Sequence, residues 1–442
     1  MNRLQRIKTI LTLGLPIIGG MLSQSLLNLV DAAMVGRLGE TALAGVGIGG
    51  YTNFLAVSLI LGLSSAVQAL VARRRGQELN SETAAPLSWG IVVAFCIAIP
   101  LSILFYINSE WLMTLLSDDI QAQTIADNYF SYRVLALLAV GLNLSFRGYW
   151  NGTNRPIVYL RILLMVQLLN VLISYILIFG YFGIPPMGAP GAGLGTTISL
   201  YLGSAMFALV TLPSAAQKGL FNIHHTNLNE LRSLLRLAIP HSIQQFFFAA
   251  SIMVLFWIIG LLGTAEQAIG HVLINLALLL ILPAVGFGVA ATTLVSHALG
   301  QHNPTLASRW GWDVILAATL IIFLLSLPMW LYPDHLLSLF LATDQAISKA
   351  RTPLILTGLA ICLDAAAIVL TQALLGAGAN RSVMLISTLG QWFFYLPLAW
   401  LIGPWLGYGL TGIWLLQVFH RAGSSLIFIY IWKQRNWVHI RI

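Results

Sequence analysis

The chain contains 442 residues, of which 58% are hydrophobic and only 8% are charged. A soluble domain carries about 25% charged residues, so this composition excludes an ordinary soluble protein and predicts an integral membrane protein. The formal net charge of +8 would suit a protein that binds nucleic acid. However, the positive residues lie in short segments between apolar stretches, which is typical of membrane topology, and we expect no nucleic-acid partner.

Apolar stretches follow one another along the chain, and each is near the length of about 20 residues that spans a bilayer as a helix. We therefore predict an all-α integral membrane protein with twelve transmembrane helices in two lobes of six. The expected spans are 10–36, 44–72, 85–107, 124–150, 157–182, 189–213, 236–262, 268–299, 309–333, 346–376, 382–403 and 407–432.

The basic residues between these spans predict the topology. They concentrate in the N-terminal segment and in every second connection, whereas acidic residues dominate the connections on the other side. Because positive residues stay on the cytoplasmic side, both termini are predicted to be cytoplasmic, as an even number of spans allows. The basic positions expected there include Arg3, Arg6, Lys8, Arg73, Arg74, Arg75, Arg155, Lys218, Arg232, Arg236, Arg309, Arg381, Lys433 and Arg435.

The first predicted helix carries a single carboxylate, Asp31, in an otherwise uncharged span. Gln24 and Asn28 precede it by seven and three residues, so helical geometry places the three polar side chains on one face. An acid within a bilayer is costly unless it faces a protein cavity, and we therefore interpret Asp31 as functional. Pro16 removes a backbone N–H and frees the carbonyl of Thr12, so we expect this helix to bend there.

A second polar stripe lies on the fifth predicted helix. Gln167, Asn170 and Ser174 follow one another at positions i, i+3 and i+7, which again places them on one face. A single amide within the membrane is more often a helix–helix contact that contributes about 1 kcal/mol. Two polar stripes and a carboxylate in one lobe favour a functional cavity instead. The predicted supporting residues of this cavity are Gln24, Asn28, Asn143, Gln167 and Ser174.

The second half of the chain repeats the first. With an offset of 224 residues, Pro16 aligns with Pro240, whereas Asp31 aligns with Leu255. Because each half has six spans, both enter the membrane in the same direction, as in transporters built from parallel repeats. The expected domains are an N-terminal lobe over 1–213, a cytoplasmic connection over 214–235 and a C-terminal lobe over 236–442.

Other candidate sites are weaker. Asp364 lies within a span of the second half and is a candidate second site. Arg147 and Arg421 lie near span ends and are expected to snorkel toward the interface, and no arginine or lysine is expected deep within a span. His224 and His225 are adjacent, but no further ligand pattern accompanies them, so no metal site is predicted.

The sequence contains no recognisable motif of an enzyme. A phosphate-binding P-loop, an HExxH zinc motif and a G-x-S-x-G nucleophile elbow are all absent. We therefore predict that the protein is not an enzyme. Because there is no nucleotide-binding motif either, uphill transport would have to use an ion gradient.

Five segments, taken in chain order, carry a family resemblance. They are LPIIGGMLSQSLLNLVDAAMVGRLG, ALVARRRGQ, RGYWNGTNRP, NVLISYILIFGYFGIPPMGAPGAGLGTTIS and LDAAAIVLTQALLGAGANR. Together they resemble the multidrug and toxic compound extrusion (MATE) family over essentially the whole chain, and within it the DinF-like branch with its VcmN-type members. The resemblance implies an outward-pumping antiporter whose two lobes rock between inward-open and outward-open states.

The resemblance also implies residue roles. Asp31 and Asn170 match the cation-coupling pair of the first lobe, and Pro16 matches the proline at which the first helix bends. Ser174 occupies a position where the family often has a second acid. This replacement weakens a Na⁺ site, since hard cations prefer several oxygen ligands with more than one carboxylate.

In the second lobe, Asp364 matches an acid of the NorM-like branch. The glutamate that this branch uses on helix seven appears here as Phe248 or a neighbour. A second ion site in this lobe is therefore only weakly supported.

We hypothesise a multidrug efflux antiporter that exports amphiphilic or cationic compounds in exchange for protons. Burial favours the neutral form of a carboxyl group, so Asp31 is expected to bind and release protons and to couple this to bending at Pro16. The protein is expected to be a monomer in the lipid of the bacterial inner membrane, with H⁺ as coupling ion and no cofactor. Two alternatives remain open: a Na⁺-coupled efflux antiporter, and a lipid-linked oligosaccharide flippase of the same superfamily, which commonly has extra spans and a basic cavity.

Overall fold

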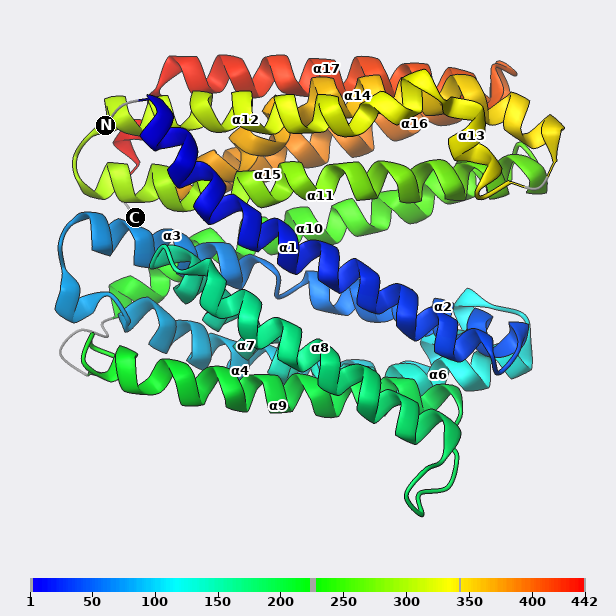
Figure 1. The fold of residues 1–442 in the computed structure, drawn as a ribbon, viewed down its shortest axis with the longest axis horizontal. Helices are drawn as coiled ribbons and strands as arrows, with labels where there is room; N and C mark the ends of the chain where they lie inside the picture. The colour runs from blue at the N-terminus through cyan, green and yellow to red at the C-terminus, as the bar shows by residue number, and fades with distance from the viewer. Residues whose placement is uncertain (1–2, 223–227, 342, 441–442) are drawn as a thin grey trace. The chain divides into compact units, whose positions relative to one another are not determined.

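The structure is a computed structural model that describes residues 3–222, 228–341 and 343–440. Long helices with short connections build both parts of the chain (Figure 1), which confirms the all-α prediction. The helices form two compact units. One consists of Gly19–Gln245 and the other of Met1–Ile18 with Phe246–Ile442. We call them the first-half unit and the second-half unit.

In the first-half unit, α8 packs along α9, α2 along α6 and α3 along α7. The side chains of Met113, Phe130, Val134 and Leu137 are almost completely buried and form a core between α2, α4, α5, α6 and α7. The elements of this unit are the later part of α1 (Arg3–Gly36), α2 (Glu40–Ser58), α3 (Gly62–Gly76), η1 (Asn80–Glu82), α4 (Ala85–Ile107), α5 (Ser109–Leu116), α6 (Ile120–Val134), α7 (Leu137–Gly152), α8 (Pro156–Phe179), α9 (Ala189–Ala216) and the first part of α10 (Leu228–Gly260).

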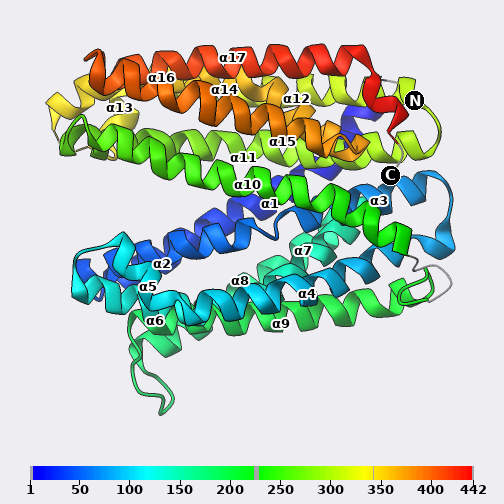
Figure 2. The same cartoon turned by 180° about the vertical axis from the view of Figure 1, so that it is seen from behind.

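In the second-half unit, α14 lies against α11, α12 and α17, and Figure 2 shows α15 and α16 from the other side. Leu273, Ile322, Leu354 and Ile413 are completely buried in its core. Besides the ends of α1 and α10, this unit contains α11 (Thr264–Gly300), α12 (Pro304–Leu331), α13 (Pro333–Ser338), α14 (Asp344–Ala377), α15 (Asn380–Leu389), the π-helical η2 (Gly390–Tyr395), α16 (Leu396–Trp400), the π-helical η3 (Leu401–Trp405), α17 (Gly409–Gln434) and η4 (Asn436–His439).

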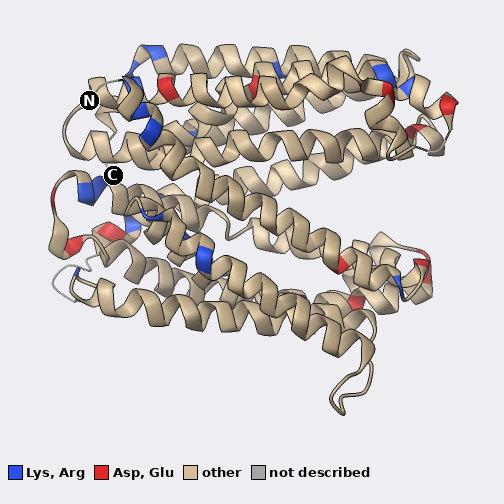
Figure 3. Ribbon diagram, viewed as in Figure 1, with Lys and Arg blue, Asp and Glu red and all other residues tan. Residues whose placement is uncertain are grey.

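The number of potential membrane spans agrees with the prediction. Among the described residues, eleven helical segments are long and apolar enough to cross a membrane. A twelfth forms if Ile120–Val134 and Leu137–Gly152, which are bent by 48°, count as one. This bent pair corresponds to the expected span 124–150. Figure 3 shows that charged residues lie mainly toward helix ends, as expected for helices in a bilayer.

Two helices cross from one unit to the other. The beginning of α1 packs within the second-half unit, where Arg6 forms an ion pair with Asp313 on α12 (2.6 Å). The beginning of α10 packs within the first-half unit, where Glu230 pairs with Arg74 on α3 (2.7 Å). Residues of α1 up to Ile18 belong to the second-half unit, and those from Gly19 belong to the first-half unit. This boundary lies two residues after Pro16, and the helix continues through that proline.

These observations correct one expected boundary. Residues 228–235 belong to α10 and not to the predicted connection over 214–235, and α9 continues to Ala216. The polar residues of this segment made it look like a loop. In the structure, one of them, Glu230, forms an ion pair with Arg74, and Leu234 of the same segment is completely buried. The division into an N-terminal and a C-terminal lobe stays a prediction. His224 and His225 lie outside the described residues.

A close approach of α10 to α3 requires glycine at position 62. A Cβ atom there would overlap the carbonyl oxygen of Ala238 and would lie 2.7 Å from Oγ of Ser242, which accepts a hydrogen bond from the Gly62 N–H (3.0 Å). We expect Gly62→Ala to lower the free energy of unfolding by about 1–3 kcal/mol through overpacking, despite the better helix propensity of alanine.

Thermal unfolding of the purified protein in detergent would check this expectation. Gly50→Ala in α2 is the matched control, because a Cβ atom at Gly50 meets no atom within 4 Å. The control is expected to be neutral or stabilising by up to about 1 kcal/mol. Equal stability of the two variants would contradict the packing argument.

Candidate functional site

Asp31, the acid of the first helix, lies in the C-terminal third of α1, within the first-half unit. Asp31 is half-buried, and its Oδ1 atom is buried without a hydrogen-bond partner among the described residues. The neighbouring Val30, Met34 and Val35 belong to an apolar cluster that includes Ile178 of α8. Asp31 is thus a polar group at the edge of an apolar cluster, where an unsatisfied carboxyl oxygen is costly.

The two polar stripes predicted on α1 and α8 meet. Gln167 Nε2 donates to Gln24 Oε1 (3.4 Å), and Gln24 Nε2 donates to Asn28 Oδ1 (3.4 Å). These contacts fix the register of the two helices. A Cβ atom at Gly20 would lie 3.3 Å from Leu163, and Val35 shares a cluster with Ile178, so α1 and α8 run in the same direction.

The register places the acid beside the second stripe. The residues of the Gln24–Gln167 pair are 143 positions apart, and the same offset from Asp31 leads to Ser174. Asn170 lies one turn earlier on the same face of α8. Both side chains are almost completely buried, at 2% and 0% exposure, and both Asn170 Oδ1 and Ser174 Oγ have no partner among the described residues.

Helix α6 adds two residues to this cluster. Tyr129 and Arg133 lie one turn apart on α6, and both interact electrostatically with Asp31. The Arg133 atoms Nε and Nη1 are buried and have no hydrogen-bond partner within the described part of the chain. We call Asp31, Tyr129, Arg133, Asn170 and Ser174 the first-half polar cluster.

Two glycines of α9 lie where this helix packs against α6 and α8. A Cβ atom at Gly193 would lie 3.2 Å from the Tyr129 ring and 3.5 Å from Cγ of Arg133, and one at Gly195 would lie 2.5 Å from Oγ of Ser174. Because the two glycines are two residues apart, they are separated by about 3 Å along the helix and point to nearly opposite faces, so the α6 residues and Ser174 lie at the same level on the two sides of α9. Larger residues at these positions would separate the helices.

Asn143 has a different environment from the one predicted. Its Nδ2 donates to the carbonyl oxygen of Leu200 (3.2 Å), and its Oδ1 accepts from Ser204 Oγ (3.0 Å). Both partners lie on α9, five and nine residues beyond Gly195, which is about 8–14 Å further along that helix. Asn143 therefore holds α7 to α9, and the structure does not bring it into the first-half polar cluster.

Asp364 in the second-half unit is satisfied, in contrast to Asp31. It is 7% exposed and forms a hydrogen-bonded ion pair with Arg421 of α17. Ser425, one turn after Arg421, donates to the carbonyl oxygen of Leu363 (2.5 Å) and accepts from the N–H of Ala367 (3.2 Å). The expectation that Arg421 snorkels to the interface is wrong, because a buried acid holds its guanidinium group.

The structure also corrects the expectation that no arginine lies deep within a span. Arg133 is the tenth residue of the expected span 124–150, and its position in that range was sufficient to identify it. Tyr129 lies one turn earlier on the same face, so a search for polar stripes on every span would have found both. The other flagged arginine, Arg147, lies 5.9 Å from the ring centre of Tyr159.

The first-half polar cluster has the components of a proton-binding site. An ionised carboxylate only accepts hydrogen bonds, whereas a protonated one can also donate. Asn170 Oδ1 and Ser174 Oγ are unpartnered acceptors, so protonation of Asp31 would supply a donor to that side of the cluster. No group of three or more His, Cys, Asp or Glu side chains that could hold a metal ion occurs among the described residues.

Comparison with known proteins agrees with the internal repeat. The family model MatE matches the chain twice, over residues 16–176 and 240–401. The two matches begin 224 residues apart (240 minus 16), which is the offset found in the sequence.

Curated relatives and solved structures cover nearly the whole chain. A "Probable multidrug resistance protein NorM" of Brucella suis is 29% identical over 97% of this chain and 93% of its own length. A protein of the same name from Bradyrhizobium diazoefficiens is 26% identical over 92% and 88%. A crystal structure of a mutant of the Vibrio cholerae MATE transporter VcmN superposes with a TM-score of 0.89 at 18% identity and covers 99% of both chains.

A second structure has the same fold. A MOP superfamily transporter from Pyrococcus furiosus, described as having a binding pocket of reversed polarity, has a TM-score of 0.89 at 19% identity and covers 97% of this chain and 96% of its own. These matches confirm the predicted fold class of twelve helices in a parallel repeat.

Proposed function

This chain belongs to the MatE family of membrane transporters, and from that premise we propose that it is a multidrug efflux antiporter driven by protons. It exports amphiphilic or cationic small molecules, in keeping with the names of its curated relatives. It acts as a monomer in the bacterial inner membrane with both termini in the cytoplasm. The DinF-like branch is part of the same proposal.

One observation carries the choice of coupling ion. Asp31 is the only carboxylate of the first-half polar cluster, and the other charged member is Arg133, whose guanidinium acts on it electrostatically. A Na⁺ ion needs several oxygen ligands and gains most from more than one carboxylate, whereas this cluster contains one. A proton needs only the one carboxyl group, so this cluster favours H⁺ as the coupling ion.

In the proposed cycle, a proton from the outer side binds to Asp31 and removes its negative charge. The protonated carboxyl group then donates to an acceptor on α8, which is Asn170 Oδ1 or Ser174 Oγ, since neither atom has a partner among the described residues. The attraction between Asp31 and Arg133 is lost in the same step. These changes bias α1 toward bending at Pro16, which reshapes the cavity and releases the substrate. Loss of the proton to the cytoplasm returns α1 to its first conformation.

One proton per cycle is energetically sufficient. A charge that moves through about 100 mV releases roughly 2.3 kcal/mol, and each pH unit adds about 1.4 kcal/mol. The sum of roughly 3.7 kcal/mol sustains a gradient of about 500-fold for a neutral substrate. A second acid such as Asp364 is not needed for the energy, and its ion pair with Arg421 makes it a poor proton carrier.

The proposal is tested with the purified protein in proteoliposomes. A pH gradient, imposed without Na⁺, is expected to drive accumulation of a fluorescent amphiphilic cation against its gradient. A Na⁺ gradient at clamped pH is expected to drive none. Accumulation driven only by Na⁺ would replace H⁺ by Na⁺ as the coupling ion, and movement of the dye without countertransport of either ion would indicate a passive channel.

The flippase alternative makes a different prediction. A cavity for the phosphates of a lipid-linked oligosaccharide requires excess positive charge, whereas Arg133 in the first-half polar cluster is balanced by Asp31. We therefore expect efflux of drugs but no transbilayer movement of a lipid-linked sugar diphosphate in the same vesicles. Movement of that lipid would overturn the assignment.

The electrostatic link between Asp31 and Arg133 is expected to appear in a double-mutant cycle. Asp31→Asn leaves the buried guanidinium of Arg133 without its counter-charge and is expected to lower thermal stability. Adding Arg133→Gln is expected to restore part of the loss, with a coupling energy of about 0.5–3 kcal/mol.

The matched control adds Arg161→Gln to Asp31→Asn. Arg161 is an exposed arginine of α8 outside the cluster, and its loss is expected to restore nothing. Equal stability of the two double variants would show that Asp31 and Arg133 do not interact.

A further inference from the structure

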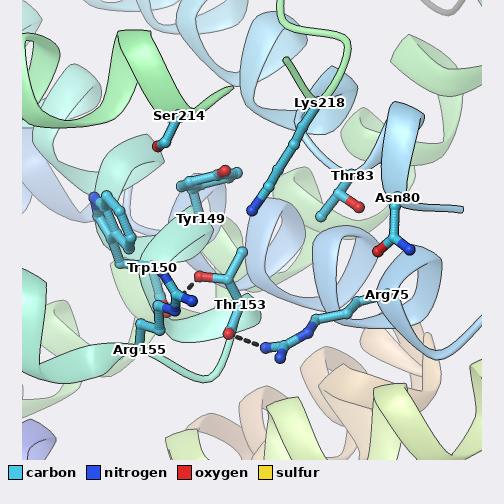
Figure 4. A pocket seen from close by; sticks show the side chains of 9 residues that line it. All are labelled: Arg75, Asn80, Thr83, Tyr149, Trp150, Thr153, Arg155, Ser214 and Lys218. Atoms are coloured by element: carbon cyan, nitrogen blue, oxygen red, sulfur yellow. Dashed lines mark hydrogen bonds between the residues drawn. The ribbon is translucent and has the colours of Figure 1, made fainter. Parts of the chain in front are cut away.

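A cavity at one end of the first-half unit has a surplus of positive charge. It has a volume of about 160 Å³, several times what one water molecule needs, and it lies where α3, α7 and α9 end. Arg75, Arg155 and Lys218 line it, and no acidic residue does. In Figure 4 the three cationic side chains extend from different segments toward the space around Thr153. The proton-coupling residues are not part of this cavity.

Two of the three cations have no bonding role within the fold. Arg75 donates a hydrogen bond to the carbonyl oxygen of Thr153 and so closes the end of α7. The side chains of Arg155 and Lys218 form no hydrogen bond or ion pair within the described part of the chain. Burial, and then the positive charges of Arg155 and Arg75, lower the pKa of Lys218. The cations therefore repel one another, and a structural role does not explain why they converge.

Two acids near this end of the unit are already engaged by another arginine. Glu82 and Glu230 lie close to Arg74, which pairs with Glu230 at 2.7 Å and donates to the carbonyl oxygen of Glu82 (2.6 Å). The backbone around the cavity is also held in place. The Ala84 N–H donates to the Lys218 carbonyl oxygen (2.9 Å), and the Phe221 N–H donates to Ser88 Oγ (2.8 Å). The cavity is thus preformed, and no acidic side chain of the described residues lines it.

The polar lining suits a tetrahedral anion. Asn80 adds an amide donor to the two guanidinium groups and the ammonium group, whereas the hydroxyl groups of Thr83 and Ser214 donate to the carbonyl oxygens of Leu79 (3.0 Å) and Thr211 (3.0 Å). Guanidinium groups bind phosphate oxygens in a bidentate manner, and an ammonium group adds a point charge. By the positive-inside rule this end of the helices faces the cytoplasm, where basic pockets between membrane helices bind anionic lipid headgroups.

We propose that this cavity is a binding site for a phosphate group, presented either by the headgroup of an anionic lipid or by a soluble phosphate. Arg155 and Lys218 neutralise the phosphate charge, Arg75 joins α3 and α7 beneath it, and the side-chain amide of Asn80 donates to its oxygens. An occupied site links the ends of α3, α7 and α9 and stabilises the first-half unit at this end.

The test measures thermal unfolding of the purified full-length protein in non-ionic detergent. One arm adds phosphatidylglycerol as mixed micelles, with phosphatidylcholine as the uncharged comparison. The other arm adds inorganic phosphate, with sodium chloride at equal ionic strength. We expect a saturable rise of the unfolding temperature that weakens with added salt. A rise with phosphatidylglycerol alone identifies the lipid as the source, and a rise with inorganic phosphate identifies a soluble phosphate.

The variants separate this site from general surface charge. Arg155→Gln/Lys218→Gln is expected to weaken binding by about tenfold or more, since charge-assisted hydrogen bonds are lost. The charge-preserving Arg155→Lys/Lys218→Arg is expected to retain binding. The control Arg309→Gln/Lys433→Gln removes the same charge from exposed positions outside the cavity and is expected to bind like the unmodified protein.

Two results would overturn the proposal. One is the absence of any shift of the unmodified protein with either probe beyond its comparison. The other is an equal shift in Arg155→Gln/Lys218→Gln and in the control. If Arg155→Gln/Lys218→Gln does not fold, the single variant Arg155→Gln is used for the binding test. This exposed side chain forms no bond within the described residues, so its replacement is expected to leave the fold intact. Binding by that single variant as tight as by the unmodified protein would then reject the site.

Discussion

Asp31→Asn is expected to abolish the exchange of substrate for protons. The variant retains the size of the side chain but cannot change its charge, so no proton can be carried by this position. Exchange of one proton for a monovalent cation moves no net charge, so accumulation of the fluorescent substrate in proteoliposomes with an imposed pH gradient should fall from a limit of about tenfold per pH unit to no accumulation. Substrate-induced proton release, followed with a pH-sensitive dye, should disappear in parallel.

The comparison variants make this result specific. Asp31→Glu keeps a carboxyl group and is expected to retain part of the coupling. Asp118→Asn removes an exposed acid between α5 and α6 and should leave transport unchanged. Full proton release by Asp31→Asn, in protein that unfolds at its normal temperature, would reject Asp31 as the coupling residue.

Arg421→Gln is expected to destabilise the protein strongly, by about 3–5 kcal/mol, because it leaves the buried carboxylate of Asp364 without its partner. The double variant Asp364→Asn/Arg421→Gln removes both charges and is expected to recover most of this loss. Unfolding in detergent, followed by tryptophan fluorescence, gives the three stabilities.

The same variants test whether the second-half unit contains an ion site. If Asp364 has only a structural role, the double variant should transport substrate with unchanged proton release per substrate. A fall in that ratio would show that Asp364 carries a coupling ion, contrary to our expectation. Arg309→Gln on α12 is the control for loss of one positive charge and should change neither stability nor coupling.

The two halves therefore keep one fold and differ in chemistry. Position 31 in the first half is an acid with a buried oxygen that lacks a partner, and the aligned position 255 is a buried leucine. Asp364 in its turn aligns with Leu138 at the offset of 226 that relates the later helices. Neither acid has an acidic counterpart at the aligned position of the other half. Of the two, only Asp31 has a buried oxygen without a hydrogen-bond partner among the described residues.

The sequence alone was sufficient for the fold class, the spans, the repeat and the acid on the first helix. These features are readable because they depend on local properties. Bilayer thickness sets the length of an apolar stretch, and a carboxylate within such a stretch is costly wherever the helix packs. The stripes on α1 and α8 were also predictable, since the spacing of Gln24 and Gln167 from their neighbours determines the helix face.

Only the tertiary structure decided which groups meet. Arg133 and Tyr129 of α6 interact electrostatically with Asp31 of α1, Gly193 and Gly195 let α6 and α8 pack closely against α9, and Asp364 pairs with Arg421 across α14 and α17. Within residues 228–235 of α10, the pairing of Glu230 with Arg74 is likewise a contact that only the tertiary structure shows. Such contacts join residues far apart in the chain. They depend on the rotation and register of packed helices, which the hydrophobic pattern of one helix does not determine.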